Sequence, residues 1–511
     1  MTTPASVAAT ATPRQLAVLQ LAVLVVAICA IIYELIIATI SSYLLGDSVY
    51  QFSITIGLFM FAMGLGSYLT KLLHAELLGI FIAVELLLAL VGGTCSVTLF
   101  LVFPYGPVYR PTMYVLTILI GLMVGLEIPI LLRILAERGG VRQSVAHVLS
   151  LDYFGALVGS VAFPLILLPD LGLFRSSFAI GLLNLGVAAV TIFAFRGMIR
   201  HVRWFAVVTA LLALGLLAGT VFAIELTSFA EDQLYRERIV YLNQTPYQRV
   251  VVTVNEDTGS HSLYLDGHLQ FAERDEYRYH EGLVHPVMSM PGSRESVLIL
   301  GGGDGMAARE VLRYPDAKQV VLVDIDPDVT RFCRTFPAIR SLNQGALDDA
   351  RLTVSNTDAF NYVRETEHRF DRVILDLPDP HNEVLGKLYS VEFYRMLAGL
   401  LKPGARVVTQ ATSPFHTREV FASIRATMLA AGFRLLSYQL NVPSFGQWGF
   451  HLAAVDEDPK MPDLLVPTRF LSKEMLAAAT VFARDDSPVD GVTNSIFEPK
   501  LYGLYSRSID R

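Results

Sequence analysis

Charged residues are scarce in this chain of 511 residues: only 17% are Asp, Glu, Lys or Arg, while 53% are hydrophobic. Soluble domains usually carry about one quarter charged residues, so a substantial part of the chain is expected to lie in a lipid bilayer. The formal net charge of -7 and the lack of a basic stripe with interleaved aromatic residues argue against a nucleic-acid partner.

Cysteine is also rare. The three cysteines, Cys29, Cys95 and Cys333, are far apart and form no CxxC pair. Two lie in apolar runs and one in a segment with a helical pattern, so we expect buried thiols. This usage supports neither a disulfide framework nor a zinc site, and we predict no bound metal.

Long apolar runs are abundant, and they predict a multi-pass transmembrane domain over residues 1–230. Seven runs approach the roughly 20 residues that a helix needs to cross a bilayer. They are Leu16–Ile40, Phe52–Leu69, Leu77–Phe103, Thr112–Leu132, Val145–Leu168, Leu173–Phe195 and Phe205–Leu226. The first run is too long for the core of a signal peptide. We therefore expect an α-helical bundle of about seven spans in the cell (inner) membrane.

Four carboxylates interrupt these runs: Glu34, Glu85, Glu127 and Asp152. A charge at the centre of a bilayer costs at least ~2.5 kcal/mol on insertion scales, which makes a functional role one interpretation. The alternative is that the acids pair with one another or with Arg133, or lie near helix ends at the membrane interface.

The composition changes at about Glu231, and membrane-type runs do not return after it. Residues 231–290 are predicted to form a small β-rich unit, because β-branched residues flank a turn at Asp257–Gly259 and Asp266-Gly267 supplies a second hairpin turn. The remaining residues, 291–511, carry the pattern of an α/β domain.

The α/β domain begins with an apolar strand, Val297–Leu300, that runs into the glycine turn Gly301–Gly305. A helix is predicted over Met306–Arg313, and a second strand over Gln319–Val323 ends in Asp324. Glycines between a strand and a helix let a ligand approach the backbone, and an acid about 20 residues further on suits the hydroxyls of a ribose. The stretch is typical of a nucleoside-binding βαβ unit, although a glycine turn that binds nothing has the same pattern.

Strands and helices continue to alternate after Asp324, which predicts a doubly wound, mainly parallel, Rossmann-like sheet of the methyltransferase type. Further strands are expected at Arg351–Val354, Arg372–Leu375 and Ala405–Gln410, and helices at Asp328–Phe336, Ala359–Thr366 and Ser390–Leu401. Such sheets bind ligands beyond the carboxyl ends of their strands. Five acids fall at those ends: Asp304, Asp324, Asp358, Asp376 and Asp379.

Five carboxylates around one crevice favour a cationic guest, such as a nucleoside that carries a sulfonium together with an organic amine. Phosphate is a poor guest, and the chain has no Walker-type lysine. A divalent metal is another interpretation, but the spacing lacks an EF-hand pattern. For any one of these acids, capping a helix or ending a turn is the alternative role.

Several motifs occur in the same order as in one enzyme family. They are Tyr247-Gln248, LDGHLQFAERDEYRYHE (Leu265–Glu281), GGGDG (Gly301–Gly305), the acids Asp324 and Asp358, DLPDP (Asp376–Pro380) and GQWGF (Gly446–Phe450). From Tyr247 to Ala454 the chain resembles the spermidine synthase (aminopropyltransferase) family, and the whole chain resembles its bacterial variant with a multi-spanning membrane region before the synthase. The resemblance implies transfer of the aminopropyl group of decarboxylated S-adenosylmethionine, a co-substrate, to putrescine or a related polyamine. It implies methylthioadenosine as the second product and no prosthetic group.

The family's functional residues can be carried over onto matching positions. The resemblance implies that the donor nucleoside is held by Gln248, Gly301, Gly303, Asp324, Asp358 and Ala359. It implies that the amines contact Tyr279, His280, Asp304 and Asp379, and that Asp376 is the catalytic residue that takes a proton from the acceptor amine. A homodimer through the synthase domain is a further expectation.

The sequence departs from the family pattern at three positions. Asp324 replaces the glutamate more usual in the family, Glu383 stands where a proline usually packs near the adenine, and Phe445 lies close to where a tyrosine is common. The acceptor loop VPSFGQWGF is also shorter than usual. The identity of the acceptor amine therefore stays open.

Two other functions share some of these features. An S-adenosylmethionine-dependent methyltransferase would use the same sheet and ribose acid, but Asp304 would repel the methionine carboxylate of its donor. Two carboxylates about 4 Å apart repel by on the order of 4 kcal/mol at an effective dielectric of about 20. A membrane polyamine transporter or sensor would instead use the intramembrane acids as a cation path, with a soluble part that only binds.

The topology carries two conflicting signals. Seven spans place the chain ends on opposite sides, and basic loops at Lys71, Arg133–Arg142 and Arg196–Arg203 would place the N-terminus in the cytoplasm and the synthase outside. The implied donor is a cytosolic metabolite, however. We therefore expect a cytoplasmic catalytic domain, with one candidate span failing to cross; Val145–Leu168 is the least regular.

Overall fold

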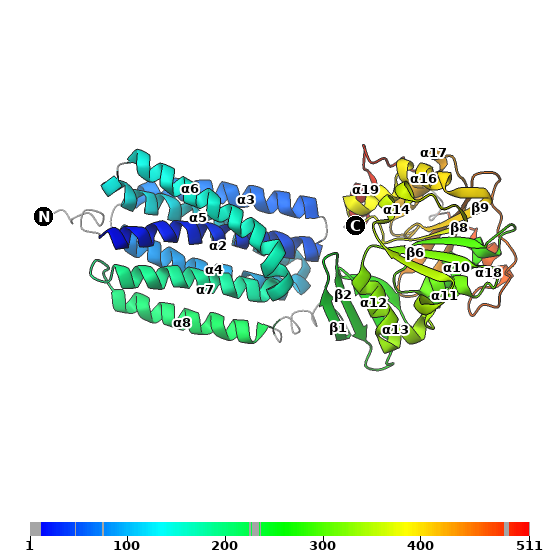
Figure 1. Cartoon of the computed structure of the whole chain (residues 1–511), viewed down its shortest axis with the longest axis horizontal. Helices are drawn as coiled ribbons and strands as arrows, with labels where there is room; N and C mark the ends of the chain where they lie inside the picture. The colour runs from blue at the N-terminus through cyan, green and yellow to red at the C-terminus, as the bar shows by residue number, and fades with distance from the viewer. Residues whose placement is uncertain are drawn as a thin grey trace. The chain divides into compact units, whose positions relative to one another are not determined.

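The computed structural model describes residues 12–45, 48–73, 76–139, 141–223, 226, 235, 237–484 and 490–509. The chain forms two compact units, Met1–Arg236 and Glu237–Arg511 (Figure 1). The boundary lies in the charged stretch EDQLYRER that follows the last apolar run. The predicted domain start at residue 231 lies outside the described residues.

The first unit is a bundle of long apolar helices. Within the described residues these are α2 (Pro13–Leu45), α3 (Ser48–Leu69), α4 (Leu77–Val102), α5 (Tyr109–Gly139), α6 (Val141–Ala162), α7 (Gly172–Ala194) and α8 (Val202–Val221). Helix α2 packs against α3, α4, α5, α6 and α7, and it is buried along much of its length. Cys29 and Cys95 are buried thiols of this unit, and Cys333 is a buried thiol of the second.

Five helical stretches in the described part of the chain are long and apolar enough to cross a membrane: Pro13–Leu45, Val49–Leu72, Leu77–Leu135, Ser144–Ala194 and Val202–Val221. Two of them contain two helices each, separated by the short segments η2 (Phe103–Val108) and η3 (Phe163–Leu171). Both separators contain prolines, which lack the N–H that continues a helix. The count of seven spans stays a prediction, and residues 224 and 225 of the last predicted span lie outside the described residues.

A four-stranded antiparallel sheet begins the second unit. Its strands are β1 (Arg238–Gln244), β2 (Arg249–Val254), β3 (His261–Leu265) and β4 (His268–Ala272), in the order β1-β2-β3-β4. The turn at Asp257–Gly259 joins β2 to β3, and Asp266 and Gly267 join β3 to β4. Asp266 and Gly267 have φ angles of 48° and 79°, as the tight turn of a two-residue hairpin requires.

A seven-stranded sheet forms the centre of the second unit, in the order β10-β11-β9-β8-β5-β6-β7. Its strands are β5 (Ser296–Gly301), β6 (Gln319–Asp324), β7 (Leu352–Asn356), β8 (Phe370–Asp376), β9 (Leu401–Gln410), β10 (Arg434–Val442) and β11 (Gly446–Ala454). Strands β5 to β9 run parallel, whereas β10 and β11 form an antiparallel hairpin that extends the sheet beyond β9. The chain leaves β5 toward β6 and β7 on one side and returns to β8 and β9 on the other. A ligand crevice is expected beyond the carboxyl end of β5, where the order reverses.

Helices cover both faces of the large sheet (Figure 1). Helices α10 (Glu276–Ser289), α11 (Met306–Leu312), α12 (Pro327–Thr335), α13 (Pro337–Leu342) and α18 (Lys473–Ala479) share one core. Helices α14 (Ala359–Glu365), α16 (Val391–Gly399), α17 (Arg418–Ala430) and α19 (Leu501–Ile509) share the other, and α15 (Glu383–Gly386) and η5 (Lys387–Tyr389) lie between α14 and α16 in the chain. Successive side chains of a strand point to opposite faces, so Val297 and Ile299 of β5 enter the first core while Leu298 and Leu300 enter the second. A strand buried on both faces reads as an unbroken apolar run.

Candidate active site

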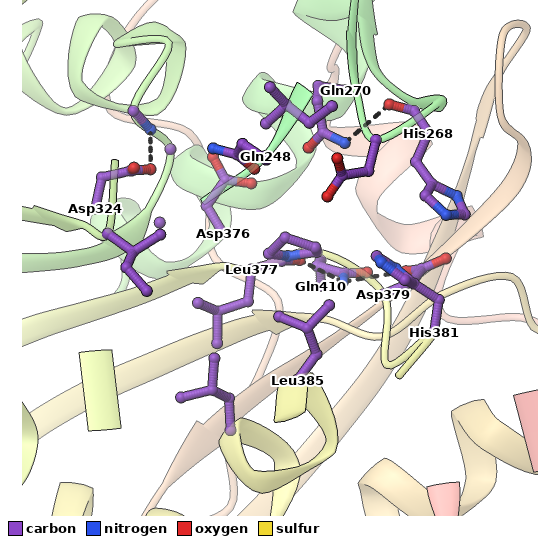
Figure 2. Close-up of a pocket in the computed structure, with 18 of the residues that line it drawn as sticks. Gln248, His268, Gln270, Asp324, Asp376, Leu377, Asp379, His381, Leu385 and Gln410 are labelled. Atoms are coloured by element: carbon purple, nitrogen blue, oxygen red, sulfur yellow. Dashed lines mark hydrogen bonds between the residues drawn. The ribbon is translucent and has the colours of Figure 1, made fainter. Parts of the chain in front are cut away.

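Residues from both sheets of the second unit line one cavity of about 490 Å³ beyond the strand ends. Figure 2 shows Gln248, from the turn between β1 and β2, and Gln270 of β4 together with Asp324 and Asp376 at the ends of β6 and β8. All the predicted site residues line this cavity: Gln248, Tyr279, His280, Gly301, Gly303, Asp304, Asp324, Asp358, Ala359, Asp376 and Asp379. The ends of the parallel strands, helix α10 and the turn between β1 and β2 together bring them to one cavity.

Asp324 closes the glycine turn that follows β5. Gly301 and Gly302 have φ angles of 83° and 69°, a conformation that favours glycine. The backbone N–H of Gly303 donates to Oδ2 of Asp324 at 3.0 Å, and the N–H of Asp326 donates to Oδ1 at 2.9 Å. Burial raises the pKa of Asp324 to about 6 in spite of these hydrogen bonds. Each carboxylate oxygen has a second lone pair that can accept from a ligand hydroxyl.

Asp326, which the sequence analysis did not single out, positions Gln248. Its Oδ2 accepts hydrogen bonds from Oγ1 of Thr245 at 2.6 Å and from Nε2 of Gln248 at 3.1 Å. Its Oδ1 caps α12 by accepting from the N–H of Asp328 at 2.9 Å. An acid before Pro327 signals a helix start, but nothing in the local sequence indicates a bond to a glutamine 78 residues away.

Asp358 begins α14 and forms an ion pair that the sequence did not indicate. Its Oδ1 accepts from the N–H of Asn361 at 3.0 Å, and its Oδ2 lies 2.8 Å from Nζ of Lys387. Burial alone would raise the pKa of Asp358, but the hydrogen bonds from Lys387 and Asn361 lower it below the usual value. Asp358 therefore caps a helix and also lines the cavity, and Lys387 adds a positive charge to the cavity wall.

Asp376 and Asp304 are partly buried and line another part of the cavity. Oδ1 of Asp376 accepts a hydrogen bond from the hydroxyl of Tyr279 at 2.7 Å. Burial and the nearby charge of Asp304 raise the pKa of Asp376 to about 6, although the positive charge of His280 opposes the rise. Burial also raises the pKa of Asp304, whose Oδ1 accepts from the N–H of Met306 at 2.8 Å.

His280 supplies the balancing positive charge. Its Nδ1 lies 2.8 Å from Oε2 of Glu276. Burial alone would lower the pKa of His280, but Glu276, together with the charges of Asp304 and Asp376, raises it to about 9. His280 is thus protonated at neutral pH and donates its Nδ1–H to Glu276.

A buried ion-pair network holds Glu276 in place behind His280. Arg309 of α11 donates to both oxygens of Glu276, at 2.9 Å and 3.0 Å, and its Nε donates to Glu310 at 2.8 Å. All three side chains are buried. A bidentate pair of this kind fixes the carboxylate plane and therefore the orientation of the imidazole that it binds. Glu276 belongs to the motif Leu265–Glu281, but its role depends on Arg309, which lies in a different helix.

Asp379 has hydrogen-bond partners of its own. Its Oδ1 accepts from Nε2 of Gln410 at 3.2 Å, and its Oδ2 accepts from the hydroxyl of Tyr505 at 3.0 Å. Burial raises the pKa of Asp379 to about 6. Gln410 ends the parallel strand β9, so its place beside the acids follows from the sheet. Tyr505 lies in α19 and gives no local signal.

Comparison with known proteins identifies the family. A family model of the spermine/spermidine synthase domain matches residues 276–463. The polyamine aminopropyltransferase of Oceanobacillus iheyensis is 39% identical over 95% of this chain and 96% of its own length. That of Leptospira interrogans is 40% identical over 96% of this chain and 99% of its own length. That of Mycobacterium tuberculosis is 40% identical over 95% of this chain and 95% of its own length. A crystal structure of spermidine synthase in complex with the transition state analogue AdoDATO covers 48% of this chain and 86% of that one, with 26% identity and a TM-score of 0.45.

The chain belongs to the polyamine aminopropyltransferase family. It is therefore a transferase whose chemistry is aminopropyl transfer. Because these matches cover nearly the whole chain, the relatives share the segment that forms the helical unit as well as the segment with the cavity.

The cavity of this aminopropyltransferase contains a histidine pair that sequence reasoning did not single out. The rings of His268 and His381 stack, with centroids 4.1 Å apart and an angle of 23° between their planes. Burial lowers the pKa of His268, and burial together with His268 lowers that of His381 to about 3. The pair is therefore neutral near pH 7 and adds a flat, uncharged wall to an otherwise acidic cavity.

The departures from the family pattern fall in different places. Phe445 lines the cavity of the transferase beside Trp448, with ring centroids 5.0 Å apart. Glu383 is exposed at the start of α15, and the following residues, Val384 and Leu385, line the cavity. Glu383, which replaces the family proline, thus lies outside the cavity, and the apolar side chains of Val384 and Leu385 form the cavity wall beside it.

Proposed function

We propose that this aminopropyltransferase moves the aminopropyl group of decarboxylated S-adenosylmethionine to putrescine and releases spermidine and methylthioadenosine. The observation that carries the proposal is the placement of two partly buried acids, Asp376 and Asp379, at the carboxyl end of one strand, β8, each with its own hydrogen-bond partners. A diamine needs one group at the reacting nitrogen and another at the nitrogen that stays charged. Two separately held carboxylates meet this requirement.

On the donor side, Asp324 would bind the ribose hydroxyls, and the nucleobase would lie near Gln248 and Asp358. Gly301, Gly303 and Ala359 would let the nucleoside approach the backbone. Glycine is also required at position 303 because a Cβ there would collide with the Asp324 carboxylate. The sulfonium of the donor already activates the carbon under attack. The protein therefore needs to align the amine behind that carbon, and no covalent nucleophile or prosthetic group is required.

On the acceptor side, Asp376 would take the proton. Amines of this type have pKa values near that of lysine, about 10.4, and arrive protonated at neutral pH. Asp376 first takes one proton from the ammonium group, which frees the lone pair of the nitrogen. As this nitrogen then bonds to the carbon, the carbon–sulfur bond breaks and sulfur keeps the electron pair of that bond. A pKa of about 6 keeps Asp376 ionised near pH 7 and makes it a stronger base than an ordinary aspartate. Tyr279 would fix its orientation, and Asp379 would hold the distal ammonium.

Asp304 separates this proposal from a methyltransferase that uses the same sheet. In the proposed pose Asp304 and His280 lie beside the tail of the donor, where the parent compound carries a carboxylate. The acid would repel that carboxylate by on the order of 4 kcal/mol at about 4 Å and an effective dielectric of about 20. The decarboxylated donor avoids this repulsion.

The test uses the full-length protein in detergent, with decarboxylated donor and putrescine. Equal amounts of methylthioadenosine and spermidine, measured by mass spectrometry, are expected. Parallel reactions with longer amines establish the acceptor, and the undecarboxylated donor is the control. Comparable methyl transfer from the undecarboxylated donor, or no methylthioadenosine with any diamine, would contradict the proposal.

We further propose that the helical unit spans the cell (inner) membrane and that the catalytic unit faces the cytoplasm. The five apolar helical stretches support the first statement, and the cytosolic origin of the proposed donor supports the second. Reporter fusions after Leu226 and in the loop Arg196–Arg203 test the orientation, and an external signal after Leu226 would contradict it. A homodimer through the second unit stays a prediction that light scattering can check.

A further inference from the structure

Two glutamates meet inside the helical unit. Glu85 of α4 and Glu127 of α5 are completely buried, and their carboxyl groups lie within hydrogen-bonding reach of each other. Apart from this contact, their four oxygens have no hydrogen-bond partner among the described residues. Arg133, a predicted partner, instead donates from Nη1 to the carbonyl oxygen of Thr70 at 3.0 Å.

Uncharged polar side chains from two other helices surround this pair. Tyr33 of α2 packs its ring on Gly92 of α4, interacts electrostatically with both glutamates, and has a fully buried hydroxyl that lacks a partner in the described part of the chain. Asn184 of α7 is also fully buried, and both its amide atoms lack partners there.

The register of α4 and α7 places Asn184 near the pair. Ser177 of α7 donates to the carbonyl oxygens of Gly92 and Gly93 of α4, and Gly181 lies against the carbonyl oxygen of Ala89. The two helices therefore run antiparallel, and Asn184, about one turn beyond Gly181, reaches the level of Glu85.

Glu85 and Glu127 cannot both be ionised at the same time. Two carboxylates in contact and away from water repel each other and lose their hydration, so the two groups retain at least one proton between them. Arginine, lysine and histidine are absent from α4, and Arg175, the only one in α7, lies roughly 13 Å along the helix from Asn184. Within the described residues, the thiol of Cys29 and the hydroxyl of Tyr33 are titratable groups that interact electrostatically with both glutamates.

We propose that Glu85 and Glu127 form a buried proton-binding site in the helical unit, where the two carboxyl groups share one proton and Tyr33 and Asn184 supply further hydrogen bonds. Such a site can take up and release a proton inside the bundle. It gives the helical unit a chemistry that aminopropyl transfer does not need.

Infrared spectroscopy of the purified full-length protein tests the proposal. Wild type should show a carboxylic-acid C=O band at neutral pH that shifts in D₂O, and E85Q/E127Q should lose this intensity. Each single variant should shift the band, because removing one partner breaks the shared hydrogen bond. E76Q, whose glutamate is exposed and paired with Arg200, is the control and should leave the band unchanged. Wild type without such a band, or a double variant that retains its full intensity, would overturn the proposal; the first result does not depend on how the variants fold.

A second inference concerns the C-terminal segment, which lies beyond the matched synthase domain of residues 276–463. Asn494 is buried and ties this segment to the cavity wall. Its Nδ2 donates to the carbonyl oxygens of Gly386 at 2.9 Å and Tyr389 at 3.2 Å, and its Oδ1 accepts from the N–H of Lys500 at 2.9 Å. These bonds fix the start of α19 against α15 and η5.

The anchored helix α19 then brings Tyr505 to the cavity. Leu501, at the start of the helix, is completely buried, and Tyr505 lines the cavity with its hydroxyl 3.0 Å from Oδ2 of Asp379. Gln410 occupies the other oxygen of Asp379. Both oxygens are therefore oriented by side chains that come from separate elements.

We infer that Tyr505 is a positioning residue that fixes Asp379 for the charged nitrogen of the acceptor, an inference that rests on the proposed function. Y505F removes only the hydroxyl. Because the variant loses a hydrogen bond to a charged group, the KM for the amine should rise about tenfold. The kcat and the KM for the donor should stay within about twofold of the wild-type values.

The matched control is S508A, which also removes a hydroxyl from α19; Ser508 donates to the carbonyl oxygen of Leu504 within the helix. It should leave all kinetic constants unchanged. If wild type turns over but Y505F keeps the wild-type KM for the amine, the inference fails and the proposed function stands. If wild type releases no methylthioadenosine, the proposed function itself fails.

Discussion

The hydroxyl of Tyr279 lies 2.7 Å from Oδ1 of Asp376 at the wall of the cavity. This hydrogen bond holds the carboxyl group by one oxygen and leaves the other, Oδ2, to accept the proton of the amine in the proposed reaction. The division of labour within the acidic cavity leads to four predictions about single side chains.

Replacing Asp376 with Asn keeps the shape and removes the proton acceptor. Because general-base catalysis contributes about 10²–10⁴ in rate, kcat should fall by that factor while donor affinity changes little. In wild type, kcat should also fall as the pH drops through about 6, where Asp376 becomes protonated. Steady-state kinetics across this pH range provide the measurement.

Asp371 offers the matched control for Asp376. It lies in the same strand, accepts from the N–H of Ser296 at 2.9 Å and pairs with Lys402 at 3.1 Å. Asp371→Asn should lower the melting temperature and keep kcat. The assignment of Asp376 as the base is wrong if Asp376→Asn retains more than about a tenth of the wild-type kcat.

Replacing Asp379 with Asn should weaken binding of the acceptor and appear chiefly as a raised KM for the amine. The physical reason is that Asp379 balances a charge that does not react, so its contribution is similar before and during the reaction. KM for the donor should not change. A fall in kcat with an unchanged KM would instead show that Asp379 acts at the reacting nitrogen.

His280 should make stability depend on pH above neutrality. Its pKa is raised from about 6.5 when unfolded to about 9 when folded. A raised pKa contributes stability that is fully present below about 6.5 and is lost as the pH rises through about 9. The melting temperature of wild type should therefore fall more steeply between these values than that of His280→Gln. Equal slopes for the two proteins would refute the assignment.

Replacing Asp304 with Asn should weaken discrimination against the undecarboxylated donor. Electrostatic repulsion of on the order of 4 kcal/mol corresponds to about three decades in affinity, and the neutral amide removes its source. Inhibition constants for the parent compound, compared with KM for the donor, give the ratio. Asp328→Asn, at the start of α12, is the control and should leave this ratio unchanged. A ratio that is also unchanged in Asp304→Asn would place the donor tail elsewhere.

Much of the catalytic unit could be predicted because its strands are buried on both faces. Val297–Leu300 reads as an unbroken apolar run, and the acid that follows each parallel strand must lie at the same edge of the sheet. This constraint predicts that Asp324 and Asp376 lie at one edge of the sheet, as the structure has them. The antiparallel hairpin β10–β11 was not predicted, since β11 follows β10 after a short turn with no helix between them.

The sequence by itself determined the apolar helices of the first unit, the parallel strands and the set of acids that surround the cavity. Only the tertiary structure decided which groups those acids touch: Lys387 on Asp358, Tyr505 on Asp379, and Glu127 on Glu85. Periodicity and turn residues report how a segment folds locally. Contacts between residues as much as 126 positions apart depend on how complete elements pack, and no local pattern records them.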